Sequence, residues 1–148
     1  MKQFLKNRKA LLSLAAILVL GFIMLRAVYP DDDFYLQDFT EVTGIEFPKK
    51  AEFLYTTASF PDHHGDYVSA SLIKVESEFY KQLPDILVKR GMVENDGKTY
   101  SDEFEKALEK AAPEEMDREL SIVTDTGAYY YVGFLSDQET ILVNRMSW

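Results

Sequence analysis

The chain has 148 residues, 47% of them hydrophobic, and it contains no cysteine. This composition argues against an intrinsically disordered or disulfide-stapled class and predicts one folded domain. The charges are unevenly placed, because residues 1–30 hold five bases and no acid, whereas residues 31–148 carry a net charge of −14. A strongly acidic body makes nucleic acid a poor candidate partner, so we expect none.

The first predicted element is an apolar helix. Residues 10–25 contain no charge and only Ser13 is polar, and residues 27–29 extend the run beyond Arg26. At about 1.5 Å per residue, roughly 20 residues cross the roughly 30 Å core of a bilayer. Bulky Leu25 occupies a position where signal cleavage needs a small residue, so the pattern favours an uncleaved signal anchor over a cleaved signal peptide.

The charges around this run predict its orientation. Bases precede it and three aspartates, residues 31–33, follow it, which is typical of a cytoplasmic N-terminus. We therefore expect three parts: a cytoplasmic basic tip at 1–9, a transmembrane signal-anchor helix at 10–29, and an extracytoplasmic acidic domain at 30–148. The membrane is then one predicted partner, through a single span.

A short helix and a hairpin are predicted next. Apolar residues at near-helical spacing indicate an amphipathic helix over 33–43, with Asp33 as N-cap and Gly44 as its stop. Alternating side chains then indicate strands at 51–57 and 66–75. Turn-forming residues between these strands predict a hairpin.

Two further helices are expected in the middle of the domain. The first begins at a predicted N-cap, Ser77, and ends at Gly91, with a kink or restart at Pro84. The second begins at Ser101, where acids follow near the positive end of the helix dipole, and ends before Pro113.

The remaining elements complete the predicted sheet. Asn95-Asp96-Gly97 is typical of a tight turn and predicts a small hairpin or an exposed loop. Strands at 120–124, 128–135 and 140–146 form a predicted three-stranded meander. The sequence therefore predicts an α+β domain, in which a five-stranded, mainly antiparallel sheet is covered on one face by two or three helices.

Both histidines lie in one predicted turn, Asp62-His63-His64-Gly65-Asp66. Imidazole and carboxylate groups are zinc ligands, so Asp62, His63, His64 and Asp66 form a candidate metal site with zinc as the candidate cofactor. A second interpretation is a plain turn in which the aspartates accept backbone N–H bonds and Gly65 takes a positive φ. A third is an acid-sensing histidine pair.

Other candidate site residues are tyrosines and glutamates. Tyr129 and Tyr131 share one face of a predicted strand, where they form either an aromatic binding surface or part of a core under helices. Glu105 and Glu109 belong to an acidic stretch that suits electrostatic steering of a basic protein partner, or simply a solvated helix face. The sequence has no cysteine, nucleophile elbow or phosphate loop, so we expect no catalytic residues.

Two motifs carry a resemblance to known proteins. Residues 43–48 read Thr-Gly-Ile-Glu-Phe-Pro and residues 62–67 read Asp-His-His-Gly-Asp-Tyr. With Asp38-Phe39-Thr40 before them, they resemble small membrane-anchored or lipidated bacterial envelope proteins that have no established activity. The resemblance implies a bacterial origin and an envelope location, with the chain in the inner membrane and the domain periplasmic or extracellular. It implies no catalytic residue.

Three functional hypotheses follow from the sequence. The first is a membrane-tethered extracytoplasmic protein-binding module that is not an enzyme, for example an immunity-type inhibitor of an envelope-targeted toxin. The second is a metal-dependent enzyme or metal sensor centred on the turn at 62–66. The third is an accessory subunit of an inner-membrane complex.

Overall fold

The computed structural model describes residues 11, 13–22, 30–59, 65–97 and 101–147. The chain divides into two compact units, Met1–Asp31 and Asp32–Trp148. In the first unit residues 13–22 are helical, and the large apolar side chains described there are exposed.

The membrane prediction is wrong for the described residues of this first unit. Within the residues that the structure describes, no helix is both long enough and apolar enough to cross a bilayer. This finding overturns the predicted signal anchor at 10–29 and the inner-membrane location drawn from it. Residues 10, 12 and 23–29 of that predicted span lie outside the described residues.

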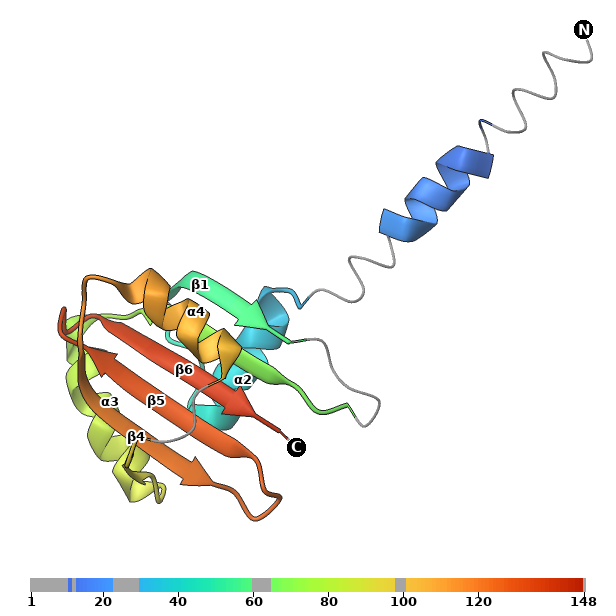
Figure 1. Ribbon diagram of the computed structural model, residues 1–148. Helices are drawn as coiled ribbons and strands as arrows, with labels where there is room; N and C mark the ends of the chain where they lie inside the picture. The colour runs from blue at the N-terminus through green and yellow to red at the C-terminus, as the bar shows by residue number, and fades with distance from the viewer. Residues whose placement is uncertain (1–10, 12, 23–29, 60–64, 98–100, 148) are drawn as a thin grey trace, which may run out of the picture. The chain divides into compact units, whose positions relative to one another are not determined.

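The second unit is built on an antiparallel sheet in which the described residues form six strands (Figure 1). The strands are β1 (Glu52–Ala58), β2 (Val68–Lys74), β3 (Val93–Glu94), β4 (Met116–Val123), β5 (Tyr129–Leu135) and β6 (Thr140–Met146). Their order across the sheet is β1-β2-β6-β5-β4-β3. The predicted hairpin and the predicted meander are both confirmed, and they join because β2 pairs with β6 from Val68↔Met146 to Lys74↔Thr140.

The prediction of five strands is wrong by one. Val93 and Glu94 pair with Ser121 and Leu120 of β4, which makes β3 a short edge strand. The sequence pattern instead predicted either a small hairpin of residues 92–94 and 98–100 around the turn at 95–97 or an exposed loop, and residues 98–100 lie outside the described part of the chain.

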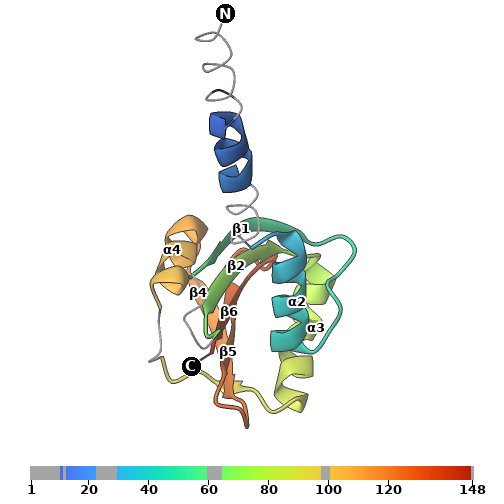
Figure 2. The same cartoon turned by 90° about the vertical axis from the view of Figure 1, so that its right-hand side faces the viewer.

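Three helices of this unit cover both faces of the sheet, not one as predicted. They are α2 (Asp32–Thr43), α3 (Ser77–Lys89) and α4 (Asp102–Ala111). Figure 2 views the sheet edge-on, with α4 on one side and α2 and α3 on the other. The sheet therefore needs apolar side chains on both faces, and two buried clusters separate accordingly.

The alternation of β5 shows how one strand serves both clusters. Val132 and Phe134 point into the cluster under α2 and α3, whereas Tyr129, Tyr131 and Leu135 belong to the cluster under α4. Because successive strand residues point to opposite faces, a strand buried on both sides needs apolar or aromatic residues at every position. β5 therefore lies at the centre of the domain.

The predicted helix ends are confirmed in part. The Ser101 side chain caps α4 by accepting a bond from the Phe104 amide at 3.1 Å, as expected. Gly44 ends α2 with a φ of 67°, which is the left-handed conformation that glycine tolerates. The prediction for α3 is wrong in one respect, because its N-cap is Glu76 and no side chain caps it.

Candidate functional site

A buried carboxylate stands at the contact between α2 and the sheet. Asp38 of α2 is only 5% exposed. Its oxygens accept hydrogen bonds from the Tyr67 hydroxyl, at 2.6 Å, and from the Ser69 hydroxyl. Arg145 of β6 places its Nη1 atom 3.7 Å from Asp38 Oδ1. These contacts join α2 to β2 and β6, strands that are far apart in the sequence.

A second carboxylate, that of Glu41, belongs to the same network and lies one helical turn after Asp38 on α2. Glu41 Oε1 accepts hydrogen bonds from Arg145 Nη2 at 3.0 Å and from the Tyr130 hydroxyl at 2.6 Å. The Arg145 guanidinium also lies over the Tyr67 ring, 4.4 Å from its centroid. Arginine is suited to this position because its planar, weakly hydrated cation can stack on a ring and donate to two carboxylates at once.

Burial dominates the electrostatics of this network. It raises the pKa of Asp38 to about 6, although the hydrogen bond from Ser69 and the charge of Arg145 both favour the ionised carboxylate. Burial also raises the pKa of the Tyr130 phenol, and the hydrogen bond to Glu41 adds to that effect. Both Asp38 oxygens already accept hydrogen bonds, so the group is suited to holding α2 in place.

A cavity lies next to this network. The cavity has a volume of about 160 Å³ and lies between α2, α3 and the strands β4 and β5. Four polar and four apolar side chains line it: Glu41, Arg90, Thr124 and Tyr130, and Val42, Leu87, Met92 and Ile122. Glu41 and Tyr130 thus belong both to the buried network and to the wall of the cavity.

Arg90 reaches this cavity because of a glycine. A Cβ atom built on Gly44 would lie 1.9 Å from Arg90 Nη2, so any other residue at position 44 would displace the guanidinium. Among the described residues, the guanidinium forms no ion pair or hydrogen bond. An exposed, unpaired arginine at the mouth of a partly apolar cavity can bind an anionic group.

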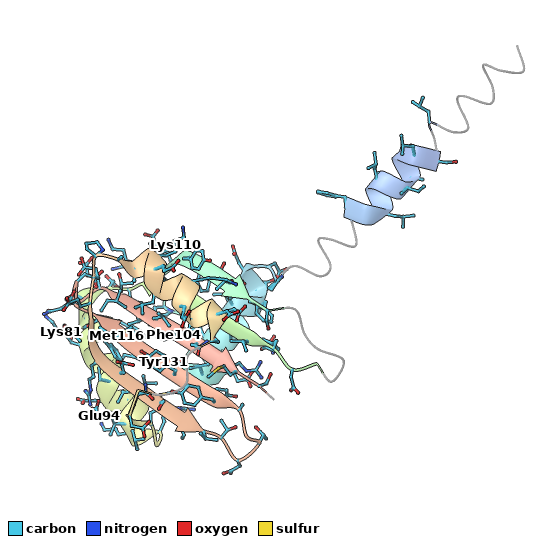
Figure 3. All side chains as sticks on the ribbon, in the orientation of Figure 1. Lys81, Glu94, Phe104, Lys110, Met116 and Tyr131 are labelled. Carbon is cyan, nitrogen blue, oxygen red and sulfur yellow. The ribbon has the colours of Figure 1, made fainter. Side chains whose placement is uncertain are left out.

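The predicted tyrosine pair lies in the core. Tyr129 and Tyr131 are buried on the α4 side of the sheet. Their hydroxyls donate to Asn95 Oδ1 at 2.9 Å and to Glu119 Oε2 at 2.8 Å. Figure 3 shows Tyr131 beside Phe104 of α4, and the two rings meet edge to face with centroids 5.1 Å apart. The structure thus places these tyrosines in core packing under α4.

The predicted glutamates lie on the outer surface of α4. Glu105 and Glu109 are both exposed. The two lysines of this helix are engaged elsewhere, since Lys106 pairs with Glu103 at 3.6 Å and Lys110 lies 5.9 Å from the centroid of the Tyr55 ring. Within the described residues neither Glu105 nor Glu109 has an ion-pair partner, so their charges are uncompensated.

The predicted metal site falls largely outside the described residues. Asp62, His63 and His64 are not among them, whereas Asp66 is partly buried and Gly65 has a φ of 88°. A positive φ at Gly65 is what the plain-turn interpretation expects. Searching the described part of the chain for three or more metal-binding side chains in one place finds no such group.

The buried network was not predicted, although the sequence carries a signal for it. Asp38 falls on the same helical stripe as Tyr35, Phe39 and Val42, all of which are buried. A carboxylate on the apolar stripe of an amphipathic helix needs hydrogen-bond partners in the folded protein. Those partners come from β2 and β6, which helical periodicity cannot identify.

Comparison of this chain with protein-family models, with curated proteins and with solved structures finds no match.

Proposed function

We propose that this protein is a non-enzymatic binding module whose partner is a protein with a basic contact surface. The surface that would meet this partner is the outer side of α4, around Glu105 and Glu109. An inhibitor that neutralises a basic toxin by covering its surface is a concrete form of this function.

The uncompensated pair on α4 is the observation that carries this proposal. Glu105 and Glu109 are four residues apart on one helix, where like charges are neighbours and destabilise the helix by about 0.2–0.5 kcal/mol. The lysines of α4 interact with Glu103 and Tyr55 and do not relieve this repulsion. A cationic partner surface would relieve it, and the negative field of the whole domain would speed the encounter.

The interior supports a binding role in a second way. Several of its polar side chains are engaged with each other: Asp38 with Tyr67 and Ser69, and Tyr131 with Glu119. Nucleophilic catalysis requires a nucleophile beside a base with room for a substrate. In this network the Ser69 hydroxyl is buried and donates to Asp38, which suits a structural role.

The test is a crosslinking pull-down with charge-matched variants of the full chain. The variant Glu105→Gln with Glu109→Gln removes the pair, and Asp85→Asn with Asp125→Asn removes two exposed acids elsewhere. We expect the wild type and the control to recover one stoichiometric partner at low salt. We expect the glutamine variant to recover at least about tenfold less, and moderate salt to weaken all binding.

Two results would contradict the proposal. One is equal recovery of the partner by the glutamine variant and the control, and the other is the absence of a stoichiometric partner at low salt.

A further inference from the structure

The cavity between α2, α3 and the sheet holds a donor and an acceptor that are not paired with each other. Arg90 supplies a guanidinium that has no ion-pair or hydrogen-bond partner among the described residues. Glu41 Oε1 accepts bonds from Tyr130 and Arg145, and Glu41 Oε2 accepts none from the residues described. A cation and a carboxylate therefore face one cavity, and each has bonding capacity to spare.

The fold holds the Glu41 carboxylate in place, and it leaves the Arg90 guanidinium exposed. Tyr130 and Arg145 fix the Glu41 carboxylate at 2.6 and 3.0 Å. The Arg90 guanidinium lies against Gly44, where a Cβ atom would displace it. Gly44 directly follows α2, and Glu41 lies in the last turn of that helix, so Glu41 and the contact between Gly44 and Arg90 both lie near its C-terminal end. The Glu41 carboxylate is therefore ordered before a ligand arrives, which lowers the entropic cost of binding.

The rest of the cavity wall is mixed, and the cavity is small. Its apolar part comes from Val42, Leu87, Met92 and Ile122, and Thr124 and Tyr130 add two hydroxyl groups. Its volume of about 160 Å³ lies below the roughly 300–1,000 Å³ of pockets for drug-sized ligands. The occupant is therefore a small molecule with a short apolar body.

We propose that this cavity binds a free α-amino acid with an apolar side chain. The carboxylate of the ligand would pair with Arg90, its ammonium group would donate to Glu41, and its side chain would pack on the apolar part of the wall, where Ile122 is the most exposed residue. The net charge of −14 on residues 31–148 favours this ligand over a simple carboxylate, because a zwitterion has no net charge to be repelled.

This site is independent of the proposed protein-binding surface. α4, which carries Glu105 and Glu109, lies on the opposite face of the sheet from α2 and α3 (Figure 2). Binding of an amino acid and binding of a basic protein can therefore succeed or fail separately.

The ligand test is calorimetric titration of the full chain with a panel of small molecules. We expect saturable binding of L-leucine or L-methionine with a Kd of about 1 mM or tighter. Three analogues each lack one feature: 4-methylpentanoate has no ammonium group, 3-methylbutylamine has no carboxylate, and glycine has no apolar side chain. Each should bind at least about tenfold more weakly than leucine. Three results would overturn the proposal. They are binding of 4-methylpentanoate as tight as that of leucine, binding of glycyl-leucine as tight as that of leucine, and no saturable binding of any apolar amino acid.

The residue test uses two neighbouring cations. Arg90→Gln removes the guanidinium from the cavity, and Lys89→Gln removes the same charge from an adjacent exposed position that does not line it. We expect leucine to bind at least about tenfold more weakly to Arg90→Gln and to bind Lys89→Gln within about twofold of the wild type. Equal affinity of the two variants for leucine would overturn the assignment of Arg90. Circular dichroism of both variants checks that they fold, which we expect because both side chains are exposed.

Discussion

Replacing Asp38 by asparagine should remove a specific pH dependence from the stability of the domain. The folded protein raises the pKa of this carboxyl to about 6 from its ordinary value of 3.8, mainly because the group is buried. An acid whose pKa is higher in the folded state binds its proton more tightly there. Its contribution to stability is therefore fully present below pH 3.8 and is lost as the pH rises through about 6.

The magnitude follows from the two pKa values. A change from 3.8 to about 6 corresponds to about 3 kcal/mol of free energy between the protonated and ionised forms. Asp38 is 5% exposed, so solvent screens this effect little. Most of the change should fall between pH 4 and pH 6.5. Over that range, the unfolding free energy of the wild type should decrease relative to that of Asp38→Asn.

The assay is urea unfolding of both proteins at half-unit steps from pH 4 to pH 7.5. Taking the difference between the two proteins cancels the titration of the other acids, and Asp85→Asn controls for the loss of one negative charge from an exposed position. A difference that stays flat, or that favours the wild type increasingly as the pH rises, would refute the reasoning. It would mean that the ion pair with Arg145 outweighs the cost of burial.

Three further substitutions test the packing and capping of the domain by thermal and urea unfolding. Leu83→Ala leaves a cavity in the fully buried cluster under α3 and should cost about 3 kcal/mol, and a cost below about 1 kcal/mol would show that the site is loosely packed. Ser101→Ala removes the cap of α4 and should cost about 1 kcal/mol, whereas an unchanged midpoint would mean that water replaces the cap. Gly133→Ala brings a Cβ atom within 2.5 Å of Met116 Sδ and 2.8 Å of the Tyr131 hydroxyl, so we expect a loss of about 1–3 kcal/mol that Met116→Ala partly restores.

Local sequence signals predicted most elements of the domain because those elements carry local patterns. The cap at Ser101, the stop at Gly44 and the alternation along β5 each involve neighbours within a few residues. β3 was missed because two residues are too few to show an alternating pattern, and its existence depends on pairing with β4. The apolar run in residues 10–29 predicted a membrane span, which the described helical residues do not support.

The candidate sites were harder to predict than the elements. Glu105 and Glu109 were expected on an exposed face of α4, and they lie there, because helical periodicity separates them from the apolar residues of that helix. Arg90 and Glu41 line one cavity only because α2 and α3 lie on the same side of the sheet. Whether the histidine turn binds zinc stays a prediction, which zinc titration of the full chain and of a variant with His63→Ala and His64→Ala would test.

The sequence by itself determined the α+β class, the antiparallel meander and the acidic character of the domain, because composition and short-range periodicity are properties of neighbouring residues. Only the tertiary structure decided that α4 covers one face of the sheet while α2 and α3 cover the other. It also decided that Tyr131 packs in the core and that Asp38 meets Arg145 across more than a hundred residues of chain. Such contacts depend on which strands pair and which faces are buried, and a buried charge selects its partners only after that packing exists.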